Sequence, residues 1–318
     1  MNRRRRVIHK SLVTIYSVFT ILLFIDALPV SAGEKYPKFS IRLSGEVGIM
    51  AIGDVNTGLR TFNDNQVFEY IRKNNPDWGR LEGNINTLKN SFGNGEFELR
   101  IDLSRRIGLG ISTASGLHRQ NESSLTYSFI TDVTWRYEYY YKPAIWVSAP
   151  LRMSLYCYLR PGSRFSSYIS GGIGYYRGGL KEQFNLTDIN GYSGLVSWTR
   201  RYWETQSKAA LGFHVGQGME LLLSRNLALT AEIQWRYVRI SNFRAIQRYE
   251  TGYPQYEEST GYLYYFTSDD LYVGIRRADL TVWEVPPDYS IYFIMDVRKA
   301  RLDLTGLSLK VGLRIRLF

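Results

Sequence analysis

Cysteine and histidine are almost missing from this sequence. Cys157 is the only cysteine among 318 residues, which excludes an intrachain disulfide and a metal cluster built on cysteine ligands. Histidine occurs only as His9, His118 and His214, too few and too scattered to indicate a zinc site. The sequence therefore predicts no metal site and no other cofactor.

Long apolar runs and proline are also scarce. After residue 25 no stretch approaches the ~18 consecutive apolar residues that a membrane helix needs. There are 9 prolines against 28 glycines and 25 tyrosines, and this composition favours β structure.

The one long apolar run lies at the N-terminus. The cations Arg3–Arg6 and Lys10 precede the apolar segment Leu12–Ile25, and the small residues Val30-Ser31-Ala32 follow it. This order predicts a secretory signal peptide over residues 1–32 and a mature domain over 33–318. The alternative is an uncleaved membrane anchor.

The charge excess is mild once this segment is removed. Loss of five cations and one acid lowers the formal net charge from +11 to +7. Part of that excess lies in strands, and an exported protein rarely meets nucleic acid, so we expect no nucleic-acid binding.

The C-terminal segment 304–318 has a period of two. One face carries Leu307, Leu309, Val311, Leu313, Ile315 and Leu317, and the other carries Gly306, Ser308, Lys310, Gly312, Arg314 and Arg316. The segment is long enough to cross a bilayer, which takes about 9–11 tilted strand residues. A cation at the bilayer midplane costs ~2–4 kcal/mol. If the apolar face meets lipid, the polar face must therefore point away from it.

Seven other segments show the same alternation. They are residues 39–51, 96–103, 107–112, 145–159, 165–176, 208–221 and 227–237. Short turns at 104–106, 160–163 and 224–226 alternate with long loops at 53–95, 116–142, 178–204 and 242–303. An even strand number with short periplasmic turns and long outer loops is typical of outer-membrane barrels. The predicted fold is all-β: a closed, antiparallel, up-and-down transmembrane β-barrel of about eight strands.

The long loops contain local structure of their own. Asn63 could cap a short helix that carries Phe68, Tyr70 and Ile71. Residues 116–142 predict a hairpin beyond the membrane, and residues 262–266 and 290–297 predict another. If these hairpins joined the barrel, it would have ten or more strands.

Glycine indicates which face is the interior. Most strand glycines, among them Gly108, Gly172, Gly212 and Gly218, lie on the polar face. Glycine in a strand marks close quarters, and a narrow lumen is more crowded than solvent. The polar face is therefore predicted to line the lumen, where charges must be paired. The alternative is the solvated face of a secreted β-sandwich.

The predicted lumen network contains charges of both signs. Its members are Arg42, Glu46, Glu98, Arg100, Asp102, Arg152, Lys208, His214, Glu220, Glu232, Arg236, Lys310 and Arg314. A second set, near strand ends, fits the aromatic belts at the membrane interfaces: Tyr156, Tyr158, Tyr175, Tyr176, Trp235 and Tyr237.

Three pieces of the sequence carry a family resemblance. They are 48–56 (GIMAIGDVN), 212–216 (GFHVG) and 223–232 (LSRNLALTAE). Together with the final Phe318 they resemble the bacterial outer-membrane β-barrel domain family, akin to the small OmpW- and OmpA-type barrels. The resemblance implies an eight-stranded barrel in the bacterial outer membrane, inserted by an assembly machinery that reads a C-terminal aromatic residue, here Phe318. It is one position out of phase with Leu317 and Ile315, which departs from the family's usual pattern.

No catalytic set emerges from the sequence. His214 lies in the lumen phase with no serine nucleophile assigned to it, and a hydrogen bond to a carboxylate is the expected role.

We therefore predict a non-enzymatic monomer with a membrane-structural or surface-interaction role through its outer loops. Its predicted partners are outer-membrane lipid, lipopolysaccharide and the assembly machinery. The alternatives are a narrow porin-like or small-hydrophobe channel, and a lipid A-modifying enzyme that depends on His214.

Overall fold

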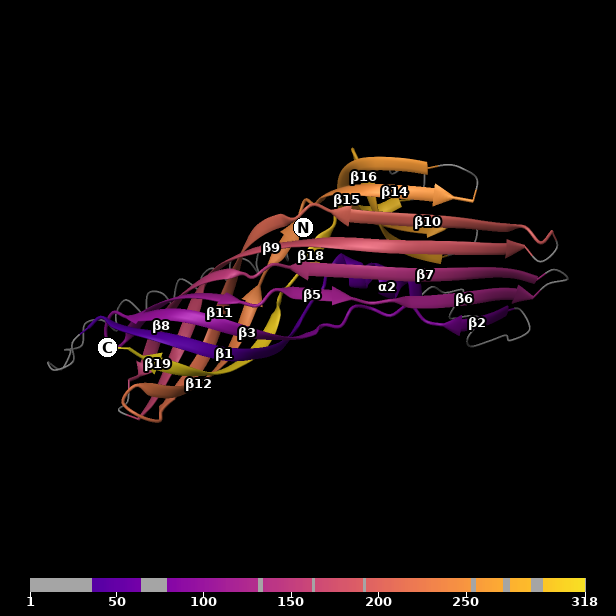
Figure 1. Cartoon of the computed structure of the whole chain (residues 1–318). Coiled ribbons are helices and arrows are strands. Elements are labelled where there is room, and N and C mark those ends of the chain that lie inside the picture. The colour runs from indigo at the N-terminus through magenta and orange to yellow at the C-terminus, as the bar shows by residue number, and fades with distance from the viewer. Residues whose placement is uncertain are drawn as a thin grey trace, which may run out of the picture.

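Eight strands form a closed ring in the computed structural model, which describes residues 36–63, 79–130, 134–161, 164–190, 193–252, 256–270, 275–286 and 294–317. In ring order they are β1 (Lys38–Met50), β3 (Ser91–Asp102), β4 (Ile107–Ala114), β8 (Leu151–Arg160), β9 (Phe165–Asn190), β11 (Lys208–Leu222), β12 (Leu227–Tyr237) and β19 (Gly306–Arg316). All eight pairings are antiparallel, and β19 pairs with both β12 and β1, which closes the ring (Figure 1). The predicted eight-stranded barrel is confirmed.

The long loops extend the same sheet beyond the ring, and we call this extension the outer sheet. It contains β2 (Gly79–Gly83), β5 (Leu117–Gln120), β6 (Ser123–Ile130), β7 (Thr134–Val147), β10 (Val196–Thr205), β14 (Arg244–Thr251), β15 (Tyr256–Asp270), β16 (Ile275–Trp283) and β17 (Ile294–Lys299). The link is β9, whose 26 residues run from the barrel into this sheet, where its second half pairs with β7 and β10. The hairpin predicted within 116–142 is confirmed by the β6–β7 pairing, and β15 pairs with β17. These strands extend beyond the ring instead of widening it.

Smaller elements lie where the barrel meets this outer sheet. Strands β13 (Arg239–Ser241) and β18 (Arg301–Asp303) form a two-stranded sheet. The helix α2 (Asp54–Asn63) packs against β16 and β18. The sequence placed Asp54 in a long loop and a helix cap at Asn63, and both assignments are wrong, because Asp54 begins the helix and Asn63 ends it. The rest of that predicted helix, with Phe68, Tyr70 and Ile71, lies outside the described residues.

The predicted strand 145–159 is also wrong as one element. It is broken at Ser148–Pro150, so that Ile145 and Val147 belong to β7 and Leu151 begins β8. Ile145 and Val147 are buried in the outer part, whereas Leu151 is 55 % exposed. Pro150 has no backbone N–H to donate to a sheet ladder, which fits a break at this point.

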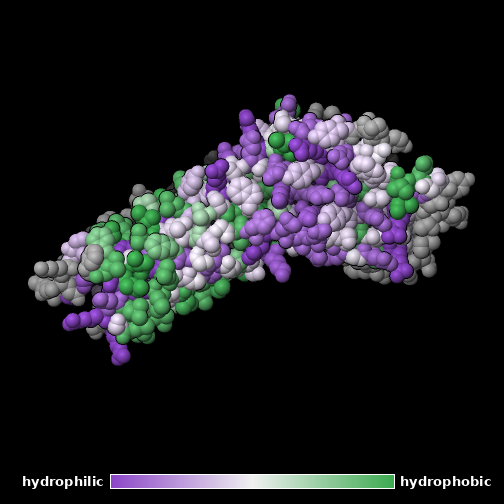
Figure 2. All heavy atoms as spheres, in the orientation of Figure 1, coloured by the Kyte–Doolittle hydropathy of each residue, from purple (hydrophilic) through white to green (hydrophobic). Residues whose placement is uncertain are grey.

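The barrel and the outer part differ in which side chains point inward: polar ones in the barrel and apolar ones in the outer part. In the barrel, apolar side chains point outward: Leu309 is 45 % exposed, while its neighbour Lys310 is 2 % exposed. In the outer part, apolar side chains such as Leu125, Leu180, Val238 and Leu302 form a buried core. On the face that Figure 2 shows, the barrel strands are mainly green and the outer sheet is mainly purple. An apolar band around a closed barrel is the surface that meets lipid, and a solvated polar face of a sandwich is excluded.

Interior glycines lie in close quarters, as the sequence predicts. A Cβ atom on Gly172 would lie 2.9 Å from the His214 ring, and one on Gly218 would lie 2.5 Å from the Tyr168 hydroxyl. Larger residues at these two positions would overlap lumen side chains. Glycine is therefore needed there to make room for the ring and the phenol.

Candidate functional site

Buried charges fill the middle of the lumen. Six acids (Glu46, Glu96, Glu98, Asp102, Glu220 and Glu232) and six bases (Arg42, Arg100, Arg152, Arg236, Lys310 and Arg314) are all buried inside the ring. We call these twelve residues the ionic plug. Its formal charges cancel, which is what burial away from water demands of a set of charges.

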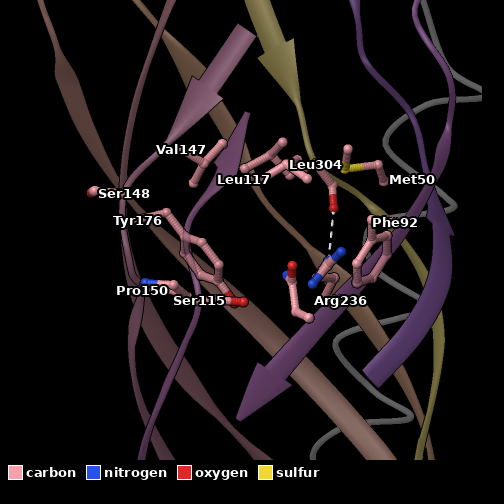
Figure 3. Close-up of a pocket in the computed structure, with 11 residues that line it drawn as sticks. Met50, Phe92, Ser115, Leu117, Val147, Ser148, Pro150, Tyr176, Arg236 and Leu304 are labelled. Atoms are coloured by element: carbon pink, nitrogen blue, oxygen red, sulfur yellow. Dashed lines mark hydrogen bonds between the residues drawn. The ribbon is translucent and has the colours of Figure 1, made fainter. Parts of the chain in front are cut away.

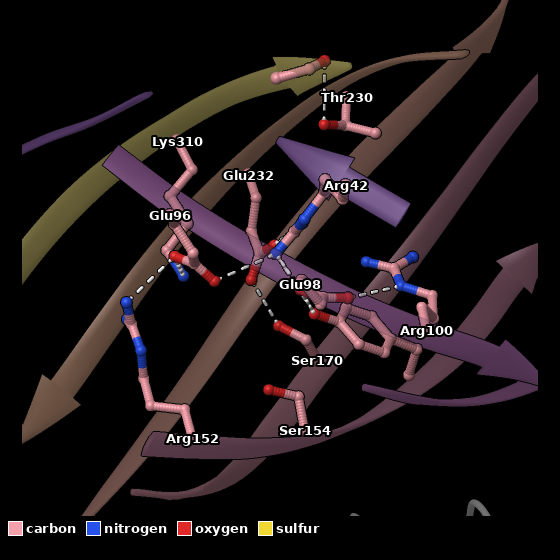
Figure 4. A network of polar contacts seen from close by, with 12 residues as sticks. Arg42, Glu96, Glu98, Arg100, Arg152, Ser154, Ser170, Thr230, Glu232 and Lys310 are labelled. Atoms are coloured by element: carbon pink, nitrogen blue, oxygen red, sulfur yellow. Dashed lines mark hydrogen bonds and ion pairs between the residues drawn. The ribbon is translucent and has the colours of Figure 1, made fainter. Parts of the chain in front are cut away.

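Arg42 is the centre of the plug (Figure 4). Its Nη2 lies 2.5 Å from Glu98 Oε2, and its Nη1 lies 2.8 Å from Glu232 Oε2. The same guanidinium donates to the hydroxyls of Tyr156 and Tyr168, at 3.3 and 3.4 Å. A single cation thus joins β1 to β3, β8, β9 and β12 across the lumen.

Glu220 organises the part of the plug nearest the short turns. Its Oε1 accepts from Arg100 Nη1 at 2.8 Å and from Arg314 Nη1 at 2.9 Å. Arg314 also pairs with Asp102 and donates to the Tyr158 hydroxyl at 2.6 Å. These contacts cross the barrel between strands that are not neighbours in the ring.

Glu96 organises the part nearest the outer sheet. Lys310 Nζ lies 2.7 Å from Glu96 Oε2, and Arg152 Nη2 lies 3.1 Å from the same atom. Glu46 is shared between Arg152 and Arg236, at 3.5 and 3.4 Å. Glu96 is missing from the network predicted from the sequence, although its alternation with Glu98 and Arg100 places it on the lumen face.

Two predictions about individual positions are wrong. Lys208 is exposed at the outer end of β11 and does not belong to the plug. Tyr156, Tyr158 and Tyr176 are buried in the interior and are not interfacial. Tyr175 and Trp235, by contrast, are about half exposed on the outside, at 50 % and 45 %. These tyrosines were assigned to an interface because they lie near strand ends. The phase of Tyr156 and Tyr158 in β8, however, matches that of Arg152 and Ser154.

His214 does not bond to a carboxylate, which corrects the expectation from sequence. Its Nε2 lies 2.8 Å from the Ser154 hydroxyl oxygen, and its Nδ1 has no hydrogen-bond partner. A serine–histidine pair is the core of a nucleophilic site. Here, however, the carboxylate that would orient the ring through Nδ1 is missing from the described contacts. The pair is also buried among plug residues.

An apolar core closes the lumen on the side of the outer sheet. Met50, Phe92, Tyr176 and Leu304 lie above the plug, with the guanidinium of Arg236 4.3 Å from the centre of the Phe92 ring. The Arg236 Nε donates to the Leu304 carbonyl at 3.1 Å (Figure 3). The cavity among these side chains has a volume of about 30 Å³, which is the space of about one water molecule.

The opposite end of the barrel is open but shallow. A cavity of about 370 Å³ is lined there by Lys38, Asp102, Arg105, Tyr158 and Arg316, among others. Its inner limit is formed by Asp102 and Tyr158, which contact the plug through Arg314. The plug therefore separates this cavity from the apolar core.

The outer part is pinned in place by its own polar contacts. Asp54, at the start of α2, pairs with Arg298 and accepts the backbone N–H of Arg301 at 2.8 Å. The side-chain Nδ2 of Asn56 donates to the Leu88 carbonyl at 2.9 Å, and its Oδ1 accepts the Leu88 backbone N–H at 2.8 Å. The helix is thus fixed inside the outer sheet, over the apolar core.

A buried carboxyl in the outer sheet has an unusual pKa. Arg201 binds Asp279 with two hydrogen bonds of 2.8 Å, so Glu182 receives only longer bonds, of 3.3 Å from Arg201 and 3.2 Å from Trp203. Burial raises the pKa of Glu182 to about 7, and the charge of Arg201 only partly offsets this effect. Glu182 is therefore a group of this sheet that titrates near neutral pH.

We expect the outer sheet to be more stable at pH 5 than at pH 8. The unfolded carboxyl ionises near its ordinary pKa of 4.5, while the folded one keeps its proton up to about 7. The free energy of unfolding then falls as the pH rises through this range, by about 1–3 kcal/mol. Hydrogen exchange of β9 and β10, corrected for intrinsic rates, measures it. Glu182→Gln should flatten the dependence, and the exposed control Glu204→Gln should keep it. An unchanged pH dependence in Glu182→Gln contradicts the assignment.

No three His, Cys, Asp or Glu side chains in the described part of the chain gather to hold a metal ion. None of the helices in the described ranges is long and apolar enough to span a membrane. The predicted signal peptide and the predicted assembly signal Phe318 lie outside the described residues.

The closed ring and its lipid-facing exterior define the class: the chain is an integral outer-membrane β-barrel protein. No family model matches it, and no curated protein matches it. Solved structures that it resembles include the outer membrane protein OprG of Pseudomonas aeruginosa, at 10 % identity and a TM-score of 0.37 over 90 % of this chain and 98 % of that one. A major outer membrane protein of Thermus thermophilus matches at 9 % and 0.33 over 89 % and 100 %. The outer membrane protease OmpT of Escherichia coli matches at 9 % and 0.30 over 90 % and 100 %.

Proposed function

We propose that this protein is a non-conducting, non-enzymatic barrel that holds a rigid β-sheet above the outer membrane as a surface for contacts. The observation that carries this proposal is the combination of a filled lumen with an outer sheet continuous with the barrel strand β9. An eight-stranded barrel has room for its side chains but for little else. Most of the described residues that do not cross the membrane belong to strands of the outer sheet.

The far end of the outer sheet offers an apolar contact point. Leu195 and Val196, at the tip of the β9–β10 hairpin, are 66 % and 57 % exposed. Charged side chains such as Arg200 and Arg248 occupy the same sheet. An apolar tip surrounded by polar residues is a feature of protein interaction sites, and it supports a contact role.

The transport alternative has weaker support. A narrow channel would have to pass both the ionic plug and the apolar core with its cavity of about 30 Å³. A lateral path would use the rim near Ser148–Pro150, where β7 ends and β8 begins, and that rim is lined by the same core. A lipid A-modifying enzyme would need access to the Ser154–His214 pair, which lies inside the barrel wall.

Planar-bilayer recording tests the proposal. We expect the purified protein to insert without steady single-channel steps, because no continuous water path crosses the plug. A general porin reconstituted in the same bilayer is the positive control. Steady steps of constant size would instead favour the narrow-channel alternative.

A further inference from the structure

On one side of the barrel only, cations lie just beyond the last lipid-facing side chains, at the end that carries the long loops. Where β9 leaves the barrel, the half-exposed Tyr175 is followed on the same face by the exposed Arg177. On β11, the exposed Lys208 lies three residues beyond Leu211, in the opposite phase of the strand, and after β12 the guanidinium of Arg239 lies 4.9 Å from the ring of Tyr237. These three strands are neighbours in the ring.

The rest of the ring lacks charge at this level. On β1, β3, β4, β8 and β19, the outward residues next to the last lipid-facing side chain are Ala51, Gly95, Thr113, Ala149 and Thr305. The cations therefore mark one sector of the boundary between the lipid-facing band and the outer sheet. This boundary lies at the long-loop end of the barrel, which faces the outer leaflet.

Two further cations from the outer sheet join this sector. The backbone N–H of Gln206 donates to the Arg244 carbonyl at 2.8 Å, which sets the start of β14 beside the start of β11. Arg244 is paired in register with Tyr262 on β15 and lies 5.6 Å from its ring centre. Lys299 of β17 lies 4.0 Å from the same ring.

Lys208, Arg244 and Lys299 thus converge on one partly exposed phenol, that of Tyr262. Arg244 hydrogen-bonds the Tyr262 hydroxyl, and this bond, together with the charges of Arg244, Lys299 and Lys208, lowers the pKa of Tyr262. Among the described residues, none of the three cations pairs with a carboxylate. Arg239, by contrast, is paired with Asp303 at 2.9 Å. Three like charges gathered without a counter-charge are complementary to an anion of more than one charge.

We propose that Lys208, Arg244 and Lys299 bind the phosphate groups of the outer-leaflet glycolipid, in the form of a diphosphorylated lipid A headgroup. Their level fits a headgroup whose acyl chains lie against the apolar band below. Arg244 supplies a planar donor pair for a phosphate, and the two lysines supply point charges. Arg177, which is held by a 2.6 Å bond to the Ser207 hydroxyl, flanks the site. This inference goes beyond the proposed contact role and does not depend on what the outer sheet binds.

Titration of the folded protein in detergent micelles tests the site. The probes are diphosphoryl lipid A, the monophosphoryl and dephosphorylated forms, phosphatidylglycerol and inorganic phosphate. We expect tight binding of the diphosphoryl form and a loss of affinity of at least about tenfold on removal of both phosphates. The combined variant Lys208→Gln, Arg244→Gln and Lys299→Gln should show a similar loss at low salt.

Matched variants separate the site from general charge effects. Lys89→Gln, Arg200→Gln and Arg225→Gln together remove the same charge from other exposed positions and should stay within about twofold of wild type. The exchange Lys208→Arg, Arg244→Lys and Lys299→Arg keeps the charge and should retain most of the binding. All variants should migrate as folded barrels on unheated gels. The proposal is overturned if the cluster variant binds like wild type, if the control variant loses as much affinity, or if phosphatidylglycerol or inorganic phosphate binds equally well.

Discussion

Replacement of Arg42 by methionine should lower the free energy of unfolding by about 3–5 kcal/mol. The change keeps an unbranched apolar stem but removes the guanidinium, so Glu98 and Glu232 lose the cation that lies 2.5 and 2.8 Å from them. Buried carboxylates without a partner are strongly destabilising. Urea titration of the protein in lipid vesicles, with the folded fraction read from unheated gels, measures the loss.

Two companion variants isolate the cause. Arg225→Met removes an exposed cation in a short turn and should change the free energy of unfolding by less than about 0.5 kcal/mol. Addition of Glu98→Gln to Arg42→Met should recover part of the lost stability, because a neutral amide is less costly to bury than an unpaired carboxylate. If the double variant is less stable than Arg42→Met, the ionic plug is not held by charge pairing.

Replacement of Val311 by arginine should lower the free energy of unfolding by ~2–4 kcal/mol, because it places a cation in hydrocarbon near the bilayer midplane. Val311 is the central residue of β19, is 49 % exposed on the outer face and is paired in register with Gly45 and Ala231. The adjacent Lys310 is accommodated only because its side chain points to Glu96. The same urea titration measures the effect.

Leu223→Arg is the matched control for this variant. Leu223 is also exposed, but it lies in a short turn at the end of the barrel, where an arginine costs about 0–1 kcal/mol. Spin labels give an independent reading, with hydrocarbon contact expected at Leu309 and Val311 and none at Ser308 and Gly312. Water contact at Leu309 and Val311 would contradict the assignment of the faces.

Strand alternation predicted the barrel well because each crossing strand obeys one simple constraint. Lipid on one side and packed charges on the other impose a period of two, and this period is visible in β3, β12 and β19 without further information. The same rule failed at 145–159. Ile145 and Leu151 share odd numbering, but the break at Ser148–Pro150 separates a strand buried in the outer core from one that faces lipid.

The site was predicted less completely than the fold. Alternation shows which residues point inward but not which of them meet across the lumen. The contact between Ser154 on β8 and His214 on β11 passes over β9, and it depends on the radius of the barrel. The pairing of Asp54 with Arg298 joins residues 244 positions apart. Such contacts arise only when the chain closes on itself.

The uninterrupted course of β9 sets the height of the outer surface. From Gly179 to Asn190 the strand continues for twelve residues past the barrel, and at ~3.3 Å per residue this segment spans about 40 Å along its own axis. Because the backbone has no joint where it leaves the bilayer, the hairpin tip cannot fold down onto the cell. A partner would meet Leu195 and Val196 at a fixed distance from the membrane and at a fixed angle to it. This geometry favours a partner that binds from outside the cell over one that lies in the membrane plane.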